Sequence, residues 1–164
     1  MIIIREDLVN SPVQIIAHQV NCRGVMDAGI AKQLAEKYKG LYKGYLDSIK
    51  GRVDGPPLGK AYVYDCWYEA VGTKMSRKII NVFGQDAYGR DGCYTNYDAV
   101  KRGFIDGIDY IREDEDIRPW NQLTIGIPFG IGCGLAGGNW DDMKKVLEEL
   151  EKIKNVLFVA HKIP

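Results

Sequence analysis

The sequence predicts an α/β fold, a three-layer α/β/α sandwich with a mixed central sheet of about six strands. Apolar runs of strand length alternate along the chain with segments whose apolar residues recur at helical spacing. Two of the junctions that lead from a strand into a helix are rich in glycine. No repeat, low-complexity tract or linker interrupts this order, so residues 1–164 are expected to form a single domain.

The first fifty residues predict two strands and two helices. Residues 1–4 are rich in β-branched side chains, which favours a short strand. Residues 13–20 are mostly apolar, which is typical of a strand buried on both faces. From residue 30 onward the apolar side chains recur at helical spacing, and Gly40 is expected to end this helix. Residues 41–49 then predict a shorter helix.

The middle of the chain predicts a hairpin followed by a long loop. Residues 60–68 alternate and are rich in Tyr and Val, which is typical of a strand. Residues 77–83 predict a second strand, paired antiparallel to the first across a turn at 69–75. The polar segment 84–92 is expected to be a loop, and loops of this length usually carry a function or are mobile.

The last part of the chain predicts two helices and two strands. Thr95 or Asn96 is expected to cap the first of these helices, which an acidic connection follows. Residues 123–129 are apolar and predict a buried strand. Residues 141–154 predict an amphipathic helix, and residues 156–160 predict the final strand.

Charge and cysteine content narrow the class of protein. The 22 basic and 22 acidic residues balance to zero net charge, which excludes the strongly basic footprint of a dedicated nucleic-acid binder. No apolar run reaches the roughly 18 residues that a membrane helix needs, so no membrane association is expected. The four cysteines form no Cys-x-x-Cys pair and there are only two histidines, which argues against a disulfide framework or a metal site. These features predict a cytoplasmic protein without a metal or other cofactor.

The stretch that organises the chain is the glycine-rich loop 130–138, which has five glycines in nine residues. Between a strand and a helix, such a loop can turn its backbone N–H groups inward as a phosphate cradle; the alternative is a flexible turn. A second glycine-bearing loop spans residues 21–29. Loops at the carboxyl ends of strands converge in α/β sheets, so the two loops are expected to grip one diphosphate from two sides. Neither loop matches the dinucleotide fingerprint or the P-loop.

Residues 17–31 and 127–140 resemble the first and second ligand loops of macrodomains, in the family's order and spacing over essentially the whole chain. Asp7-Leu8 stands where that family has its Gly-Asp-Leu/Ile turn. The most similar branch contains ADP-ribose-1″-phosphate phosphatases and glycohydrolases that remove terminal ADP-ribose from proteins. The resemblance therefore implies a macrodomain that binds ADP-ribose and hydrolyses ADP-ribose-1″-phosphate. The alternatives are removal of ADP-ribose from a modified protein or nucleic acid, with such macromolecules as partners, and a non-catalytic ADP-ribose reader.

The resemblance also implies roles for individual residues. Asp7, beside Leu8, would accept a hydrogen bond from the adenine amino group, and Asn21 would bond the distal ribose hydroxyls. The alternative for Asp7 is a solvated loop acid, and the alternative for Asn21 is a turn asparagine bonded to its own backbone. His161 or Ile163 would cover the adenine face. The remaining loop residues would line the distal ribose and wrap the phosphates: Gly24, Val25, Met26, Ala28, Gly29, Ile30, Phe129, Gly130, Ile131, Gly132, Cys133, Gly134 and Leu135. Of these, the cysteine is interpreted as a packing residue rather than a nucleophile, because no base stands beside it in the sequence.

Two departures from the family bear on catalysis. Gln85 stands where glycohydrolases of this branch use a lysine, which argues against a lysine-dependent covalent route. Asp27 stands where many relatives have glycine, and a carboxylate beside a phosphate is costly unless it is used, so we assign it acid–base chemistry or water positioning as a hypothesis. His18 is a second candidate for proton transfer, the alternative being a core histidine. Gln85, Tyr88 and Arg90 are expected to close over the ligand, with Arg90 at a terminal phosphate.

Overall fold

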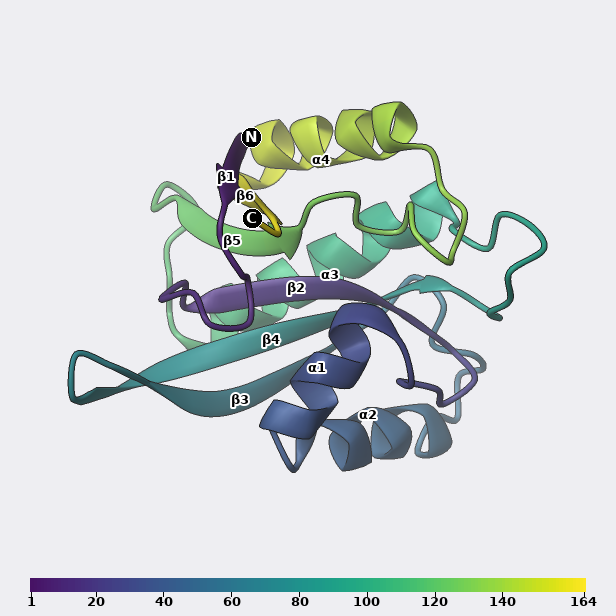
Figure 1. Cartoon of the computed structure of the whole chain (residues 1–164), viewed down its shortest axis with the longest axis horizontal. Helices are drawn as coiled ribbons and strands as arrows, with labels where there is room; N and C mark the ends of the chain where they lie inside the picture. The colour runs from purple at the N-terminus through teal and green to yellow at the C-terminus, as the bar shows by residue number, and fades with distance from the viewer.

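A mixed sheet of six strands forms the middle layer of the molecule, in the order β1-β6-β5-β2-β4-β3 (Figure 1). All neighbouring strands are parallel except β3, which runs antiparallel to β4 at one edge. The strands are β1 (Ile2–Arg5), β2 (Ile15–Asn21), β3 (Ala61–Ala70), β4 (Thr73–Gln85), β5 (Leu123–Pro128) and β6 (Val156–Lys162). The helices are α1 (Gly29–Lys37), α2 (Leu41–Lys50), α3 (Tyr97–Asp114) and α4 (Trp140–Lys154). This computed structural model describes residues 1–69 and 71–164 with their side chains and residue 70 by its backbone.

The alternation of side chains along β4 explains why helices cover both faces of the sheet. Ile80 and Val82 belong to the apolar cluster that α3 and α4 complete. Ile79 and Phe83 point to the other face, into the clusters that include residues of α1 and α2. Figure 1 shows these two helix pairs on opposite sides of the sheet. The predicted three-layer sandwich is confirmed.

The five parallel strands all end at one edge of the sheet, and this edge gathers the segments that the sequence singles out. The connection that begins at Glu6 follows β1, and the loop 22–28 follows β2. The loops that begin at residues 86 and 129 follow β4 and β5. Because parallel strands place their carboxyl ends together, segments far apart in the sequence meet here.

The β3–β4 hairpin is longer than predicted. Most of the predicted turn 69–75 is paired, because β3 runs to residue 70 and β4 begins at Thr73. Val71 and Gly72 alone form the turn, with φ of +50° and +72°, which is the conformation of a two-residue hairpin loop. At its other end β4 extends to Gln85, so the predicted loop 84–92 begins as strand.

The helix termini also settle which residues act as caps. Asn96, not Thr95, caps α3 by accepting a 3.0 Å hydrogen bond from the backbone N–H of Ala99. Asn139 caps α4 in the same way, through a 3.1 Å bond from Asp142. None of the helices in the described part of the chain has both the length and the apolar character that a membrane crossing requires.

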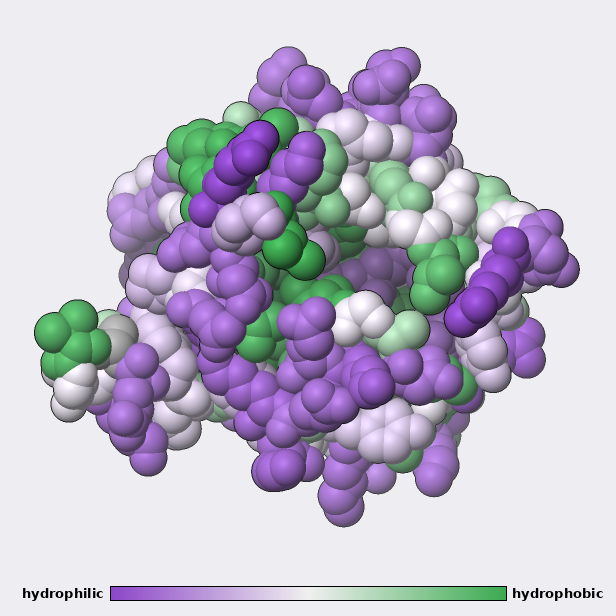
Figure 2. Space-filling view, viewed as in Figure 1, coloured by the Kyte–Doolittle hydropathy of each residue, from purple (hydrophilic) through white to green (hydrophobic). Residues whose placement is uncertain are grey.

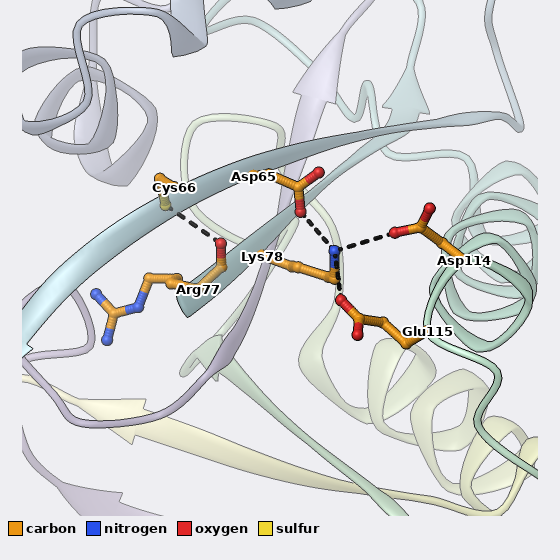
Figure 3. Close-up of polar contacts among 6 residues, drawn as sticks. All are labelled: Asp65, Cys66, Arg77, Lys78, Asp114 and Glu115. Atoms are coloured by element: carbon orange, nitrogen blue, oxygen red, sulfur yellow. Dashed lines mark hydrogen bonds and ion pairs between the residues drawn. The ribbon is translucent and has the colours of Figure 1, made fainter. Parts of the chain in front are cut away.

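Two neighbouring basic residues of β4 tie the edge of the sheet to the rest of the molecule (Figure 3). Lys78 lies among the carboxylates of Asp65, Asp114 and Glu115, with its Nζ 3.1 Å from Glu115. Arg77 points away from them, and its side chain is 1% exposed. Its guanidinium donates to three backbone carbonyls of the segment 9–13. Arg77 therefore fixes the segment that follows β1 against the sheet.

Candidate functional site

A cleft of about 620 Å³ opens at the carboxyl edge of the parallel strands, which is within the usual size range of small-molecule sites. Figure 2 shows this hollow, with hydrophobic residues along it and hydrophilic residues below it in this view. Segments that follow β1, β2, β4 and β5 all contribute to its lining, together with the end of β6. The cleft therefore lies where the two glycine-bearing loops were expected to converge.

The loop after β5 uses only part of its backbone for its own structure. The N–H of Ile131 donates to the carbonyl of Pro128, at the end of β5, at 3.1 Å. The N–H of Cys133 donates to a carbonyl within the loop at 2.8 Å, and those of Gly137 and Gly138 do the same at 2.9 Å each. Within the described residues, five other N–H groups of this loop donate to no acceptor: those of Gly130, Gly132, Gly134, Leu135 and Ala136. All five residues line the cleft. The loop therefore presents a set of backbone donors to an anion.

Helix α1 begins at the cleft without a cap. Its N-cap residue is Ala28, which offers no side-chain acceptor, and its first turn contains no acid. The cap of α3 and that of α4 are asparagines, and each of those helices carries acid in its first turn. The residues that open α1, from Gly29 to Ala31, line the cleft. A helix start with free N–H groups and a positive dipole end favours a negative ligand.

Asn21 organises the loop between β2 and α1. Its Oδ1 accepts from the N–H groups of Arg23 and Val25, at 3.0 and 3.3 Å, and from the Tyr45 hydroxyl at 2.9 Å. Its Nδ2 donates to the Val25 carbonyl at 2.9 Å. The structure thus places Asn21 as the turn asparagine that was the alternative interpretation. One N–H of its amide remains for a ligand, because Nδ2 carries two hydrogens.

Most of the sequence-predicted site residues lie in this cleft. Asp7 and Leu8 line the end that β1 and β6 form, with His161 and Ile163. The other predicted residues that line the cleft come from the ends of β2 and β4, from the loops after β2, β4 and β5, and from the start of α1: Asn21, Val25, Met26, Asp27, Ala28, Gly29, Ile30, Gln85, Tyr88, Arg90, Gly130, Ile131, Gly132, Gly134 and Leu135. The cleft therefore unites residues from five separate stretches of the sequence.

The two groups that were expected near adenine have distinct surroundings. The Asp7 carboxylate accepts from the Val9 N–H at 3.1 Å and from the Asn10 side chain at 2.5 Å. Burial lowers the pKa of His161, against the opposing effect of Glu6, whose carboxylate lies 3.6 Å from the ring. The imidazole is therefore uncharged at neutral pH, which suits contact with a neutral base.

Four sequence-predicted residues do not lie in the cleft. His18 is fully buried on β2, with its Nε2 2.7 Å from Asn81 of β4, so it is a core histidine and not a proton-transfer group. Gly24 turns away, because its N–H and carbonyl bond the hydroxyls of two tyrosines of α2. Phe129 packs outside the cleft against Trp140, with ring centroids 4.9 Å apart.

Cys133 is the fourth residue that does not line the cleft, and the correction concerns only its expected contact with phosphate. Its side chain packs against the core cluster that α3 and α4 complete, and its N–H is used within the loop. Burial raises the pKa of its thiol, which disfavours the thiolate that a nucleophile needs. The interpretation of Cys133 as a packing residue agrees with this placement.

Sequence reasoning missed several residues of the lining. The missed residues are Val9, Gln19, Val20, Ala31, Gln33, Gly89, Pro128 and Ala136. Gln19 lies one residue before the register irregularity between Val20 and Asn21, so its side chain does not follow simple alternation with that of Asn21. The signal that could have found Gln19 is a polar side chain near the carboxyl end of a strand whose first three residues are apolar.

Comparisons with known proteins agree with this geometry. No protein-family model matches the sequence. The chain is 26% identical over 162 residues to an ADP-ribose 1''-phosphate phosphatase from Debaryomyces hansenii, covering 92% of this chain and 90% of that protein. It is 30% identical over 142 residues to a DNA ADP-ribosyl glycohydrolase from Mycobacterium tuberculosis, covering 86% of this chain and 36% of that protein. The structure is similar to the macrodomain of Mycobacterium tuberculosis DarG, with a TM-score of 0.70, 25% identity and coverage of 99% and 98% of the two chains.

Proposed function

Since this chain belongs to the macrodomain family, we propose that it binds ADP-ribose in the cleft and hydrolyses ADP-ribose-1″-phosphate to ADP-ribose and phosphate. The observation that carries the proposal is the convergence of two sets of unused backbone N–H groups on one cleft. A diphosphate needs donors on two sides, and the cleft offers the uncapped start of α1 and the loop after β5. The relative from Debaryomyces hansenii, aligned over nearly its whole length, has the same named activity.

The two ends of the cleft differ in the chemistry that they offer to the rest of the ligand. At the end formed by β1 and β6, Asp7 would accept from the adenine amino group, and His161 and Ile163 would cover the ring. At the other end, Asn21 would donate its remaining N–H to a hydroxyl of the distal ribose. Adenosine and the distal ribose would thus lie on opposite sides of the diphosphate.

Hydrolysis requires a proton acceptor and a positive group beside the terminal phosphate. Asp27 lines the cleft with an exposed side chain, and Arg90 reaches the cleft from the loop after β4. In the proposed step, water attacks phosphorus and gives a proton to Asp27, while the bond from phosphorus to the bridging oxygen breaks. The bridging oxygen takes up a proton from bulk water as it becomes the ribose hydroxyl, and Asp27 releases its proton to bulk water, which restores the carboxylate. Arg90 would bind the phosphoryl oxygens as their charge is redistributed.

The second candidate function is removal of ADP-ribose from a modified macromolecule. The similarity to DNA ADP-ribosyl glycohydrolases favours it, while Gln85 in place of a lysine argues against the covalent version of that reaction. A non-catalytic reader would bind ADP-ribose in the same cleft without turnover. ADP-ribosylated DNA or protein would be the partner in both cases.

Two assays test the proposal. With ADP-ribose at about 100 times its Kd, ligand binding raises the midpoint of thermal unfolding by about 5 to 10 °C. Phosphate release from ADP-ribose-1″-phosphate then separates the phosphatase from the reader. Asp27→Asn is expected to lower kcat by about 100-fold, since acid–base groups contribute at least that much. The matched control is Asp116→Asn, at an exposed residue after α3, which leaves kcat unchanged.

The outcomes are distinct. Binding of ADP-ribose without phosphate release by the wild-type protein would favour the non-catalytic ADP-ribose reader over the phosphatase. Release of free ADP-ribose from modified DNA without phosphate release would establish the glycohydrolase. Full activity in the Asp27→Asn variant would remove the assigned role of this carboxylate and keep the phosphatase.

A further inference from the structure

A chain of side-chain hydrogen bonds joins the loop after β4 to the loop after β5, and two of its members, Gln19 and Gln85, line the cleft. The Nε2 of Gln19 donates to the Gln85 Oε1 at 2.9 Å and to the Thr95 Oγ1 at 3.0 Å. Gln85 donates in turn to the carbonyl of Ala87 at 2.9 Å. Thr95 donates to the carbonyl of Gly132 at 2.6 Å. We call these three side chains the Gln19 network (Gln19, Gln85 and Thr95).

The direction of every bond in the Gln19 network is fixed by its two ends. Ala87 and Gly132 each offer a backbone carbonyl, which only accepts, so Gln85 and Thr95 must donate to them. Gln85 Oε1 and Thr95 Oγ1 are then both acceptors. Only a group with two hydrogens can satisfy both from one position, and the amide nitrogen of Gln19 has two.

The amide of Gln19 also has no room to move. An ideal Cβ at Gly132 would lie 2.7 Å from its Oε1, and one at Gly84 would lie 2.8 Å from it. Two glycines, one from β4 and one from the loop after β5, therefore close around this amide. A side chain enclosed in this way and bonded at both hydrogens holds its neighbours in one arrangement.

The Gln19 network acts on two loops of different function. The loop 130–136 carries the free N–H groups, and its carbonyl at Gly132 accepts directly from Thr95. The loop 86–92 carries Arg90, and its attachment at Ala87 depends on Gln85, which Gln19 orients. Figure 1 shows the segments after β4 and after β5 side by side, and a 2.7 Å bond from the Tyr94 N–H to the Ala136 carbonyl joins them.

We propose that Gln19 is a positioning residue that sets where the loop 86–92, and with it Arg90, lies relative to the loop after β5. This inference rests on the proposed function, in which Arg90 meets the terminal phosphate. ADP-ribose lacks that phosphate, so its binding depends little on Gln19. Turnover of ADP-ribose-1″-phosphate depends on it strongly, because displacement of a binding group by about 1 Å can cost up to 100-fold in rate.

The test compares Gln19→Glu with wild-type protein and with Gln122→Glu, the same change at an exposed residue before β5. In the Gln19→Glu variant, the ionised carboxylate has no hydrogen to donate and faces two acceptors. We expect kcat/KM for ADP-ribose-1″-phosphate to fall at least about tenfold, with the Kd for ADP-ribose within about threefold of wild type. The ratio of variant to wild-type activity is expected to rise as pH falls, because a protonated carboxyl regains one donor. A purely structural role would produce no such recovery.

Hydrogen exchange gives a readout that does not need activity. In the unliganded Gln19→Glu variant, amides of the loop 86–92 are expected to exchange faster than in wild type and in Gln122→Glu, with α4 unchanged. Unchanged exchange in that loop overturns the inference, whatever the protein hydrolyses. Equal loss of ADP-ribose affinity and of turnover overturns it as well. Absence of phosphate release by wild-type protein, with faster exchange in the variant, instead refutes the phosphatase and keeps the positioning role.

Discussion

Two glycines of the loop after β5 share a backbone conformation but differ in the space around them, and this difference makes a quantitative test. Gly130 and Gly137 have nearly the same φ, +76° and +75°. A Cβ at Gly130 would meet nothing within 4 Å, whereas one at Gly137 would press on the carbonyl oxygen of Gly92 and lie 3.1 Å from the Cα of Cys93. These are backbone atoms, which cannot move aside as a flexible side chain can.

The strain of a left-handed alanine costs about 1 to 2 kcal/mol at either position. Gly137→Ala must in addition separate the two loops, and such forced displacement costs about 1 to 3 kcal/mol. Urea unfolding should therefore give Gly137→Ala a free energy of unfolding lower than that of Gly130→Ala by about 1 to 3 kcal/mol. Equal stability of the two variants would refute the close packing of the loop 130–138 on residues 92–95.

Two buried basic groups of the sheet give further tests of stability. Arg77→Met leaves the carbonyls of Ser11 and Val13 without donors, so it should lower the free energy of unfolding by about 2 to 4 kcal/mol; the exposed control Arg118→Met should change it by less than about 0.5 kcal/mol. Burial lowers the pKa of His18 to about 4, against a bond to Asn81 that raises it. Below its unfolded pKa of 6.5 the unfolded chain binds a proton that the folded chain rejects. Stability is therefore full above pH 6.5 and falls by about 3 kcal/mol as pH drops to 4. His18→Gln should flatten this loss in urea titrations at several pH values, and an undiminished loss would contradict the assignment.

The parts of the site that the sequence predicts well are those set by local chemistry. Gly130 and Gly132 take positive φ, as a turn between a strand and a helix requires. The start of α1 lacks a capping side chain, which is visible in the residues themselves. The convergence of both segments follows from the parallel sheet, because its strands end at one edge.

The errors concern partners that are distant in the sequence. His18 stands one residue before Gln19, but alternation along β2 turns it to the opposite face, where Asn81 meets it. Gly24 belongs to a loop that lines the cleft, and the tyrosines that turn it away come from α2. In the same way, the bonds of Gln19 to residues of β4 and of the loop before α3 depend on strand register that local patterns do not specify.

The proposed function depends on backbone N–H groups from the start of α1 and from the loop after β5 binding one diphosphate together. Titration of uniformly ¹⁵N-labelled protein with ADP-ribose tests this directly, because each amide reports for itself. We expect the resonances of residues 29–31 and 130–136 to shift together and to saturate at one equivalent of ligand. Shifts confined to one of these segments, or none in either, would contradict the shared diphosphate site.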